Sequence, residues 1–295
     1  MEVRSENGPA ALLTGYYEPE LAASRTRHDQ FQTPIYGLPE NLVSVDLGDF
    51  RNELRGERII GCAGGHRLLP CPARAAIDAA GLKQGEVLFY AADPVAVFFL
   101  HIQGSGRVRL EDGSLVRVAY AGQNGRPYKA IGRTLIERRL LPRNGMSMQI
   151  LRDWLHRNPS QAREIMETDQ SYVFFKDASL GDPALGSPGS EGVPLTPGAS
   201  LAIDPRVHPY GLPIYVAATR PDANPDKPEQ AFNRLLIAQD SGGAIRGPAR
   251  GDVFWGFGND AESIAGRMKA TGRFFVLLPT AVAARLGHRR VLTTS

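Results

Sequence analysis

The sequence lacks an apolar run long enough for a membrane-spanning helix, which requires about 20 residues. It also lacks a block of one charge, because 34 basic and 31 acidic residues are interspersed and the net charge is +3. The basic arm typical of nucleic-acid binding is therefore absent, and we expect no nucleic-acid partner. No export signal is evident, since Met1-Glu2-Val3-Arg4 leads into polar residues. These features predict either a cytosolic chain or one that has been trimmed, with no membrane span.

Cysteine and histidine are scarce and irregularly spaced. Cys62 and Cys71 match neither a zinc pair nor a CxxC redox motif, and the six histidines show no ligand spacing. We therefore predict no metal site and no cofactor. A disulfide across Ala63-Gly64-Gly65 is geometrically conceivable, but a hairpin centred there places Cys62 opposite Arg67. The register argues against a disulfide without excluding it.

What is present is an ordinary globular composition, with 42% hydrophobic and 22% charged residues over 295 positions. That length fits one large domain or two of average size. Apolar runs at 85–90, 95–102 and 171–175 predict strands, and Asp112-Gly113 predicts a hairpin turn. Helical periodicity predicts helices at 127–141, from Ser147 and from Ser160. A Pro-, Gly- and Ser-rich stretch at 181–198 predicts a linker, after which short strands joined by loops indicate a barrel.

The most informative stretch runs from Leu235 to Gly258. An apolar run over 235–238 predicts a strand buried on both faces, and it ends at a carboxylate, Asp240. A second carboxylate, Asp252, opens the next short strand after a glycine-rich loop. Charged side chains are seldom buried without partners, so two aspartates at strand ends among glycines indicate a ligand site. The alternative is a pair of turn aspartates that satisfy backbone N–H groups.

Two further segments suit a hydroxyl-rich ligand. Leu12 to Pro19 reads as a short strand that runs into Tyr16 and Tyr17, whose flat rings suit a sugar. The loop Gln103 to Gly106 carries an amide, a hydroxyl and two glycines. The alternatives are core tyrosines at a strand end and a tight turn or bulge.

Ordered motifs along the whole chain resemble the membrane-bound lytic murein transglycosylase A family. They include GYYEPEL from Gly15, QGSGRVRLEDG from Gln103, YAGQNGRPY from Tyr120, SYVFF from Ser171, and AQDSGGAIRG from Ala238 through FWGFG. The last third is similar to the three-aspartate domain of that family, with Asp204, Asp240 and Asp252 as the three.

The resemblance implies a mainly β fold in which a discontinuous double-psi β-barrel carries an inserted, second β-rich domain and few helices. The catalytic barrel is expected from residues 1–19 plus 183–295. Residues 20–182 are expected to form the inserted domain, with a groove between the two. The strand near Leu12 to Tyr16 is then expected to pair with strands after Ser200.

The resemblance also implies the chemistry. A single acid/base, Asp252, protonates the β-1,4 bond between N-acetylmuramic acid and N-acetylglucosamine, and the muramyl C6 hydroxyl then attacks to leave a 1,6-anhydro end. Burial and Asp240 are expected to raise the pKa of Asp252, and Asp204 is expected to be structural. Residues expected to bind the glycan are Thr14, Gly15, Tyr16, Tyr17, Gln103, Gly104, Ser105, Gly106, Ser241, Gly242, Gly243, Ala244 and Phe254.

The resemblance implies that the partner is the glycan strand of peptidoglycan and that the protein is a monomer. It also implies a periplasmic location, with an outer-membrane anchor in the full-length protein. Two rivals stand beside this interpretation. One is a hydrolase on the same barrel, for which Glu18 is the one plausible second carboxylate. The other is a polysaccharide-binding module that does not cut.

Overall fold

The computed structural model describes residues 1–3, 8, 10–143 and 146–287. The chain divides into two compact units. The first comprises Met1–Tyr16, Pro188–Gly256 and Ser263–Ser295, and the second comprises Tyr17–Ser187 and Phe257–Glu262. That the first is a catalytic domain and the second an insertion, with the expected boundaries, stays a proposal.

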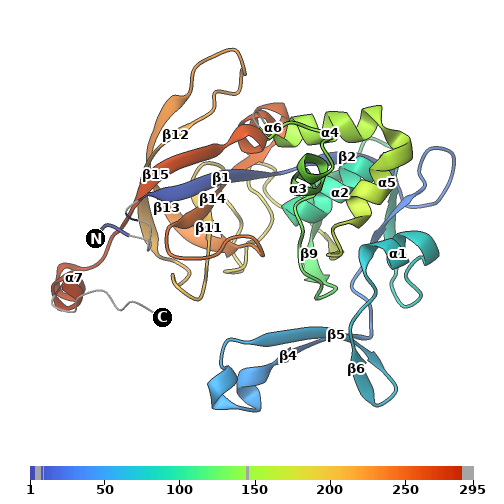
Figure 1. Cartoon of the computed structure of the whole chain (residues 1–295), viewed down its shortest axis with the longest axis horizontal. Helices are drawn as coiled ribbons and strands as arrows, with labels where there is room; N and C mark the ends of the chain where they lie inside the picture. Colours follow the sequence, from blue (N-terminus) through green and yellow to red (C-terminus); the bar gives the residue numbers. More distant parts are fainter. Residues whose placement is uncertain (4–7, 9, 144–145, 288–295) are drawn as a thin grey trace. The chain divides into compact units, whose positions relative to one another are not determined.

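The first unit is built on a closed six-stranded barrel in the order β1-β14-β11-β13-β12-β15. Its strands are β1 (Ala11–Glu18), β11 (Ser200–Ile203), β12 (Pro213–Arg220), β13 (Gln230–Ser241), β14 (Arg250–Phe257) and β15 (Lys269–Val276). In Figure 1 the N-terminal β1 lies among the C-terminal strands, and it pairs antiparallel with β15 through Leu13 and Ala270. The predicted return of the first strand to the strands after Ser200 is confirmed.

Alternation along the barrel strands decides which side chains face the core. Leu13, Leu201 and Val253 are fully buried and belong to one core cluster. Because neighbours along a strand point to opposite faces, Thr14 and Asp252 lie on the outer face of the barrel wall. The same alternation corrects the expectation that residues 235–238 are buried on both faces: Leu235 is 46% exposed. In a barrel strand only one face packs against the core, so the side chains on the outer face stay exposed even when they are apolar.

The second unit contains two sheets. One has six strands in the order β10-β9-β8-β2-β7-β3, and the other has three in the order β4-β5-β6. The strands are β2 (Glu20–Ser24), β3 (Thr33–Tyr36), β4 (Leu42–Asp46), β5 (Arg58–Gly64), β6 (Arg67–Leu69), β7 (Val87–Ala91), β8 (Gly106–Arg109), β9 (Leu115–Gln123) and β10 (Val173–Ala178). With the closed barrel, these sheets confirm a mainly β fold. Whether the barrel connections cross as a double psi stays a prediction.

Helices are fewer and mostly short. They are α1 (Arg74–Ala80), α2 (Pro94–Gln103), α3 (Ile131–Glu137), α4 (Met148–Arg157), α5 (Pro159–Glu167), α6 (Gly258–Arg267) and α7 (Thr280–Gly287), with 3-10 turns at Leu47–Asp49 and Asn52–Leu54. The helix from Ser147 is confirmed, since the Ser147 hydroxyl accepts a hydrogen bond from the Ile150 N–H and caps α4. Among the described residues, no helix is both long and apolar enough to span a bilayer.

Two secondary-structure predictions need correction: the helix predicted at 127–141 is limited to Ile131–Glu137, and residues 95–102 form helix α2, not a strand. Asp93 accepts a hydrogen bond from the Val95 N–H, Pro94 stands in the first turn, and Gly104 ends the helix at φ 80°. These are ordinary helix start and stop signals. The apolar run has the pattern of a buried strand because a helix buried on most sides shows no clear helical period.

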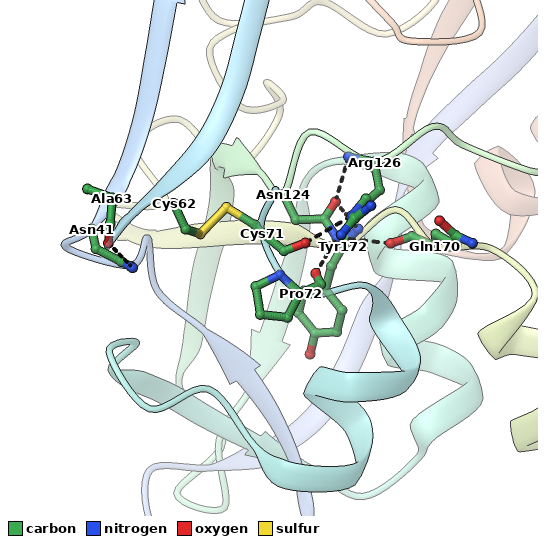
Figure 2. Close-up of a disulfide and its surroundings, with 9 residues drawn as sticks. All are labelled: Asn41, Cys62, Ala63, Cys71, Pro72, Asn124, Arg126, Gln170 and Tyr172. Atoms are coloured by element: carbon green, nitrogen blue, oxygen red, sulfur yellow. Dashed lines mark hydrogen bonds between the residues drawn. A yellow bond between two sulfur atoms is a disulfide. The ribbon is translucent and has the colours of Figure 1, made fainter. Parts of the chain in front are cut away.

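Cys62 and Cys71 are joined by a disulfide, with their Cα atoms 5.0 Å apart (Figure 2). The predicted register is wrong: the β5–β6 hairpin pairs Gly64 with Arg67, which puts Cys62 opposite Leu69, two residues before Cys71. The segment after β6 then returns to the body of the unit. Arg126 donates a hydrogen bond to the Cys71 carbonyl there, so the disulfide ties the three-stranded sheet to its own unit.

Candidate functional site

Asp240 and Asp252 flank one residue of the barrel wall. Ala202 on β11 pairs in register with Asp240 of the parallel β13 and with Asp252 of the antiparallel β14. Residues directly across a ladder point to the same face, so both carboxyl groups lie on the outer face of the barrel. Two strand spacings separate their Cα atoms, roughly 10 Å. The structure therefore brings the two predicted aspartates to one place.

Asp252 is half-buried, and one of its oxygens is held by the protein. The Thr14 hydroxyl donates a hydrogen bond to Asp252 Oδ1 at 2.6 Å. Arg250 Nη2 in turn donates to Thr14 Oγ1 at 2.8 Å. Asp252 Oδ2 accepts no hydrogen bond from the described residues, which leaves it available to a ligand.

The environment of Asp252 raises its pKa to about 6, above all because burial disfavours the ionised form. The negative charge of Asp240 acts in the same direction, whereas the Thr14 hydrogen bond and the positive charge of Arg250 act against it. At pH 7, a pKa of about 6 leaves roughly one carboxyl in ten protonated, against roughly one in a thousand for an ordinary aspartate. Asp252 can therefore act as a proton donor near neutral pH.

Asp240 is held in place by three donors. The Tyr16 hydroxyl donates to Oδ2 at 2.7 Å, while the Ser190 N–H and hydroxyl donate to Oδ1 at 3.0 and 2.9 Å. The Ser190 hydroxyl also lies 2.8 Å from the hydroxyl of Ser241. Both oxygens of Asp240 are thus engaged, which suits a group that acts on its neighbour through charge.

Asp204 has a structural role, as the sequence analysis expected. It is 1% exposed and forms a two-point ion pair with Arg206, with oxygen-to-nitrogen distances of 3.0 and 2.8 Å. It also accepts a hydrogen bond from the Gly247 N–H at 2.8 Å. The bonds from Arg206 hold the pKa of Asp204 well below its usual range. Asp204 therefore fastens the loop that leads into β14 and Asp252.

The other predicted residues of the barrel unit divide into exposed and buried groups. Gly243 and Ala244 are exposed, and Ser241 and Gly242 are half-buried, so this turn is open to a ligand. Phe254 is fully buried, with its ring 5.3 Å from that of Tyr16, and so supports Tyr16 without offering a face of its own.

Gly15 is required by packing. A Cβ at this position would lie 2.7 Å from the Trp255 ring and 2.9 Å from the Ala265 backbone.

In the second unit, the residues predicted to bind the glycan are mostly engaged in hydrogen bonds and packing within the protein. Tyr17 is 2% exposed, and its hydroxyl accepts a hydrogen bond from Arg152 at 2.8 Å. Its N–H donates to the Gln103 side-chain carbonyl at 3.0 Å. Gly104 ends α2 in the left-handed region, and a Cβ on Gly106 would lie 2.9 Å from the Pro19 carbonyl. The loop composition therefore has a structural explanation, and ligand binding by this loop stays a prediction.

Glu18 is the centre of a buried charge cluster, which we call the Glu18 cluster. Glu18 is 0% exposed, and its oxygens lie 3.1 Å from Arg107 and 3.3 Å from Arg117. The Ser187 N–H and hydroxyl donate to Oε1 at 2.7 and 2.8 Å, and the Ser105 hydroxyl donates to it at 3.3 Å. A carboxylate so enclosed cannot reach a substrate, so Glu18 does not supply the second catalytic carboxylate that a hydrolase requires.

Two residues of the site escaped the sequence analysis. Arg250 has no role in the sequence-based prediction, although it directs the hydroxyl that contacts Asp252. Ser190 lies within the stretch predicted as a linker, although it donates two hydrogen bonds to Asp240. Neither residue has a local signal, because each reaches its partner from a distant part of the chain.

Two family models match separate parts of the chain. Residues 12–176 match the MltA specific insert domain, and residues 199–278 match the 3D domain. The membrane-bound lytic murein transglycosylase A of Escherichia coli K12 is 34% identical over 275 residues, which cover 92% of this chain and 67% of the relative. The chain thus spans about two thirds of that relative's length.

Similar solved structures point to the same family as the sequence comparison. The membrane-bound lytic murein transglycosylase from Agrobacterium tumefaciens superimposes with a TM-score of 0.82 at 35% identity, over 93% of this chain and 75% of that one. The structure of E. coli MltA with bound chitohexaose superimposes with a TM-score of 0.75 at 32% identity, over 92% and 72%. Sequence and fold together show that the chain belongs to the membrane-bound lytic murein transglycosylase A family.

Proposed function

We propose that this protein is a peptidoglycan lytic transglycosylase that uses Asp252 as its single acid/base. The observation that carries the proposal is the state of Asp252: its pKa is raised to about 6 by burial, one oxygen is held by Thr14, and Oδ2 accepts no hydrogen bond from the described residues. The family supports the substrate class, since its members are named as lytic murein transglycosylases. An oligosaccharide ligand is supported by the E. coli relative solved with bound chitohexaose.

The reaction proceeds in two proton transfers. Protonated Asp252 donates from Oδ2 to the glycosidic oxygen, and the bond from that oxygen to the anomeric carbon of N-acetylmuramic acid breaks. The C6 hydroxyl of the same sugar then attacks the anomeric carbon and returns its proton to Asp252. The new bond closes a 1,6-anhydro ring, the acid is restored, and no water is consumed. Because the nucleophile belongs to the substrate, it is already close to the carbon that it attacks.

Asp240 assists without transferring the proton. Its negative charge raises the pKa of Asp252 and so keeps more of the acid protonated. Tyr16 and Ser190 fix its position. We further propose that the open turn Ser241 to Ala244 binds the glycan beside the two aspartates, and that the protein works in the periplasm. A disulfide at Cys62–Cys71 suits that oxidising compartment.

Product analysis tests the proposal. Sacculi are digested in heavy-oxygen water, and the released muropeptides are weighed. We expect anhydro ends with no label, and Asp252→Asn should reduce the rate by at least about 10⁴-fold, since general acid–base catalysis contributes about 10²–10⁴-fold and one residue serves both steps. Arg273→Gln is the matched control, since it removes a mostly exposed arginine that pairs with Glu2 and lies over the Phe275 ring.

Labelled ends would support the hydrolase instead. An inactive but glycan-binding wild type would support the binding module. Near wild-type turnover by Asp252→Asn would overturn the assignment of the acid.

A further inference from the structure

Arg250 occupies an unusual position for a charged residue beside a catalytic acid. It stands two residues before Asp252 on β14, and its side chain folds back to β1 instead of leaving the barrel. Nη1 donates to the Gly251 carbonyl at 2.5 Å and approaches the Leu12 carbonyl at 3.5 Å, while Nη2 donates to the Thr14 hydroxyl at 2.8 Å. In the part of the chain that the structure describes, it pairs directly with no carboxylate. Its charge is therefore directed at Asp252 through Thr14.

The direction of these hydrogen bonds follows from the chemistry of the donors. A guanidinium can only donate, and a threonine hydroxyl has a single proton. Since Thr14 Oγ1 accepts from Arg250, its own proton must point elsewhere, and the acceptor at 2.6 Å is Asp252 Oδ1. Arg250 thus fixes the rotation of the hydroxyl. Asp252 Oδ1 always accepts, and the acidic proton is confined to Oδ2.

The same arrangement acts on the charge of Asp252. A positive group and a hydrogen bond to the ionised form both favour the carboxylate, against burial and Asp240. The charged groups that face Asp252 are Arg250 from its own strand and Asp240 from β13. On the other packed strands, β11 presents Ala202, and β1 presents Thr14, whose β15 partner is the exposed Lys269.

From this geometry we propose that Arg250, acting through Thr14, is a positioning residue that selects Oδ2 of Asp252 as the proton-bearing oxygen and limits how far the acid is held protonated. This proposal rests on the proposed function of Asp252. A single acid/base must donate its proton in one step and accept one in the next. If its pKa were too high, it would donate the proton too slowly in the first step. Arg250 offsets part of the effect of burial and keeps both steps accessible.

Four variants separate this role from a structural one. Arg250→Leu and Thr14→Val break the chain of hydrogen bonds. Arg250→Lys keeps the charge but loses the planar fork, and Thr14→Ser keeps the hydroxyl. Arg273→Gln on β15 is the matched control for loss of an arginine from the same barrel. Thermal unfolding of each variant confirms that it is folded before its activity is compared.

The first readout is the pH dependence of kcat/KM on isolated glycan strands. Activity requires protonated Asp252, so it is full below the pKa and falls as the pH rises through it. Removing a group that favours the ionised form raises the pKa, so Arg250→Leu and Thr14→Val should move the alkaline limb upward by roughly one pH unit. Their kcat at low pH should fall about tenfold with little change in KM. Thr14→Ser should keep the wild-type limb, and Arg250→Lys should fall between.

The second readout does not depend on turnover. The carboxyl carbon of Asp252 is titrated by NMR in the full chain, with its signal assigned from the loss in Asp252→Asn. The wild-type midpoint should lie near 6, as the pKa of about 6 requires, and should rise in Arg250→Leu and Thr14→Val. Unchanged midpoints in both variants would overturn the role of Arg250, even if Asp252→Asn is inactive. Shifted midpoints with an active Asp252→Asn would instead uphold this role and overturn the proposed function.

Discussion

The Glu18 cluster makes a sharp prediction about stability, because Glu18 is a fully buried carboxylate whose two arginine partners are also buried. Arg107 and Arg117 are 3% and 4% exposed at their side chains. Glu18→Gln keeps the shape but removes the negative charge and turns an amide N–H₂ toward groups that donate. Breaking a buried ion pair by removing one partner costs about 3–5 kcal/mol, since the remaining charge is left uncompensated. We expect the second unit to lose that much free energy of unfolding.

Glu20→Gln provides the matched control two residues along the chain. Glu20 pairs with Arg109 at 2.7 Å, but the two side chains are 38% and 51% exposed. Exposed pairs contribute about 0–1 kcal/mol, so this variant should unfold almost as the parent does. The same chemical change should thus differ in cost between the two sites by about 2–5 kcal/mol, by the same two magnitudes.

Urea unfolding followed by tryptophan fluorescence measures the effect within the correct unit. The chain has two tryptophans, of which Trp154 lies in the second unit and Trp255 in the first. With Trp255→Phe as the common background, Trp154 reports the second unit alone. A loss of 3–5 kcal/mol with a slope of about 2 kcal/mol per molar moves the midpoint by about 1.5–2.5 M.

If Glu18→Gln and Glu20→Gln unfold at the same urea concentration, the buried ion pairs of Glu18 do not stabilise the second unit more than the exposed pair of Glu20 does. A second result would revive the hydrolase: full stability in Glu18→Gln, together with a large loss of turnover, would make Glu18 a catalytic base after all.

Two further predictions concern the aspartate pair and the disulfide. Asp240→Asn removes a charge that raises the pKa of Asp252, so the alkaline limb of kcat/KM should move downward, and activity at pH 7 should fall by up to about tenfold; an unmoved or rising limb would contradict the tuning role. Cys62→Ser opens a crosslink between residues nine apart in sequence and should cost about 2–3 kcal/mol, seen as faster proteolysis of the β4-β5-β6 sheet in native conditions. Equal proteolysis of parent and variant, with and without reductant, would show that the disulfide carries no such stability.

The sequence allowed the two central aspartates to be found because each follows or opens an apolar strand beside glycines. Pattern alone could not show that both face the same residue, Ala202, since that depends on one parallel and one antiparallel pairing. The return of β1 to the barrel was expected only from the family resemblance. No periodicity in Leu12 to Tyr16 specifies a partner more than 250 residues away.

The failures have physical causes that local patterns do not carry. Helix α2 was mistaken because burial on most sides erases the apolar period. Glu18 is the one plausible second carboxylate by sequence, but its partners Arg107 and Arg117 come from the β8–β9 hairpin, far from it in the chain. Arg250 was overlooked because its contact with Thr14 joins the two ends of the chain.

The barrel has a consequence for how the protein is made. β1 is synthesised before the other strands of the barrel, yet its Leu13 pairs with Ala270, which lies 257 residues later in the chain. At about 5–20 residues per second, that interval is roughly 13–50 s. Both edges of β1 stay unpaired until β14 is made, and one edge stays unpaired until β15 is made, which is a hazard for aggregation.

The large sheet of the second unit meets no such delay, because its strands lie between Glu20 and Ala178. That sheet can close while the ribosome is still at work. Among the six barrel strands, β1 is therefore made first and has the longest interval before its partners exist, so a chaperone that holds unfolded protein is expected to bind there.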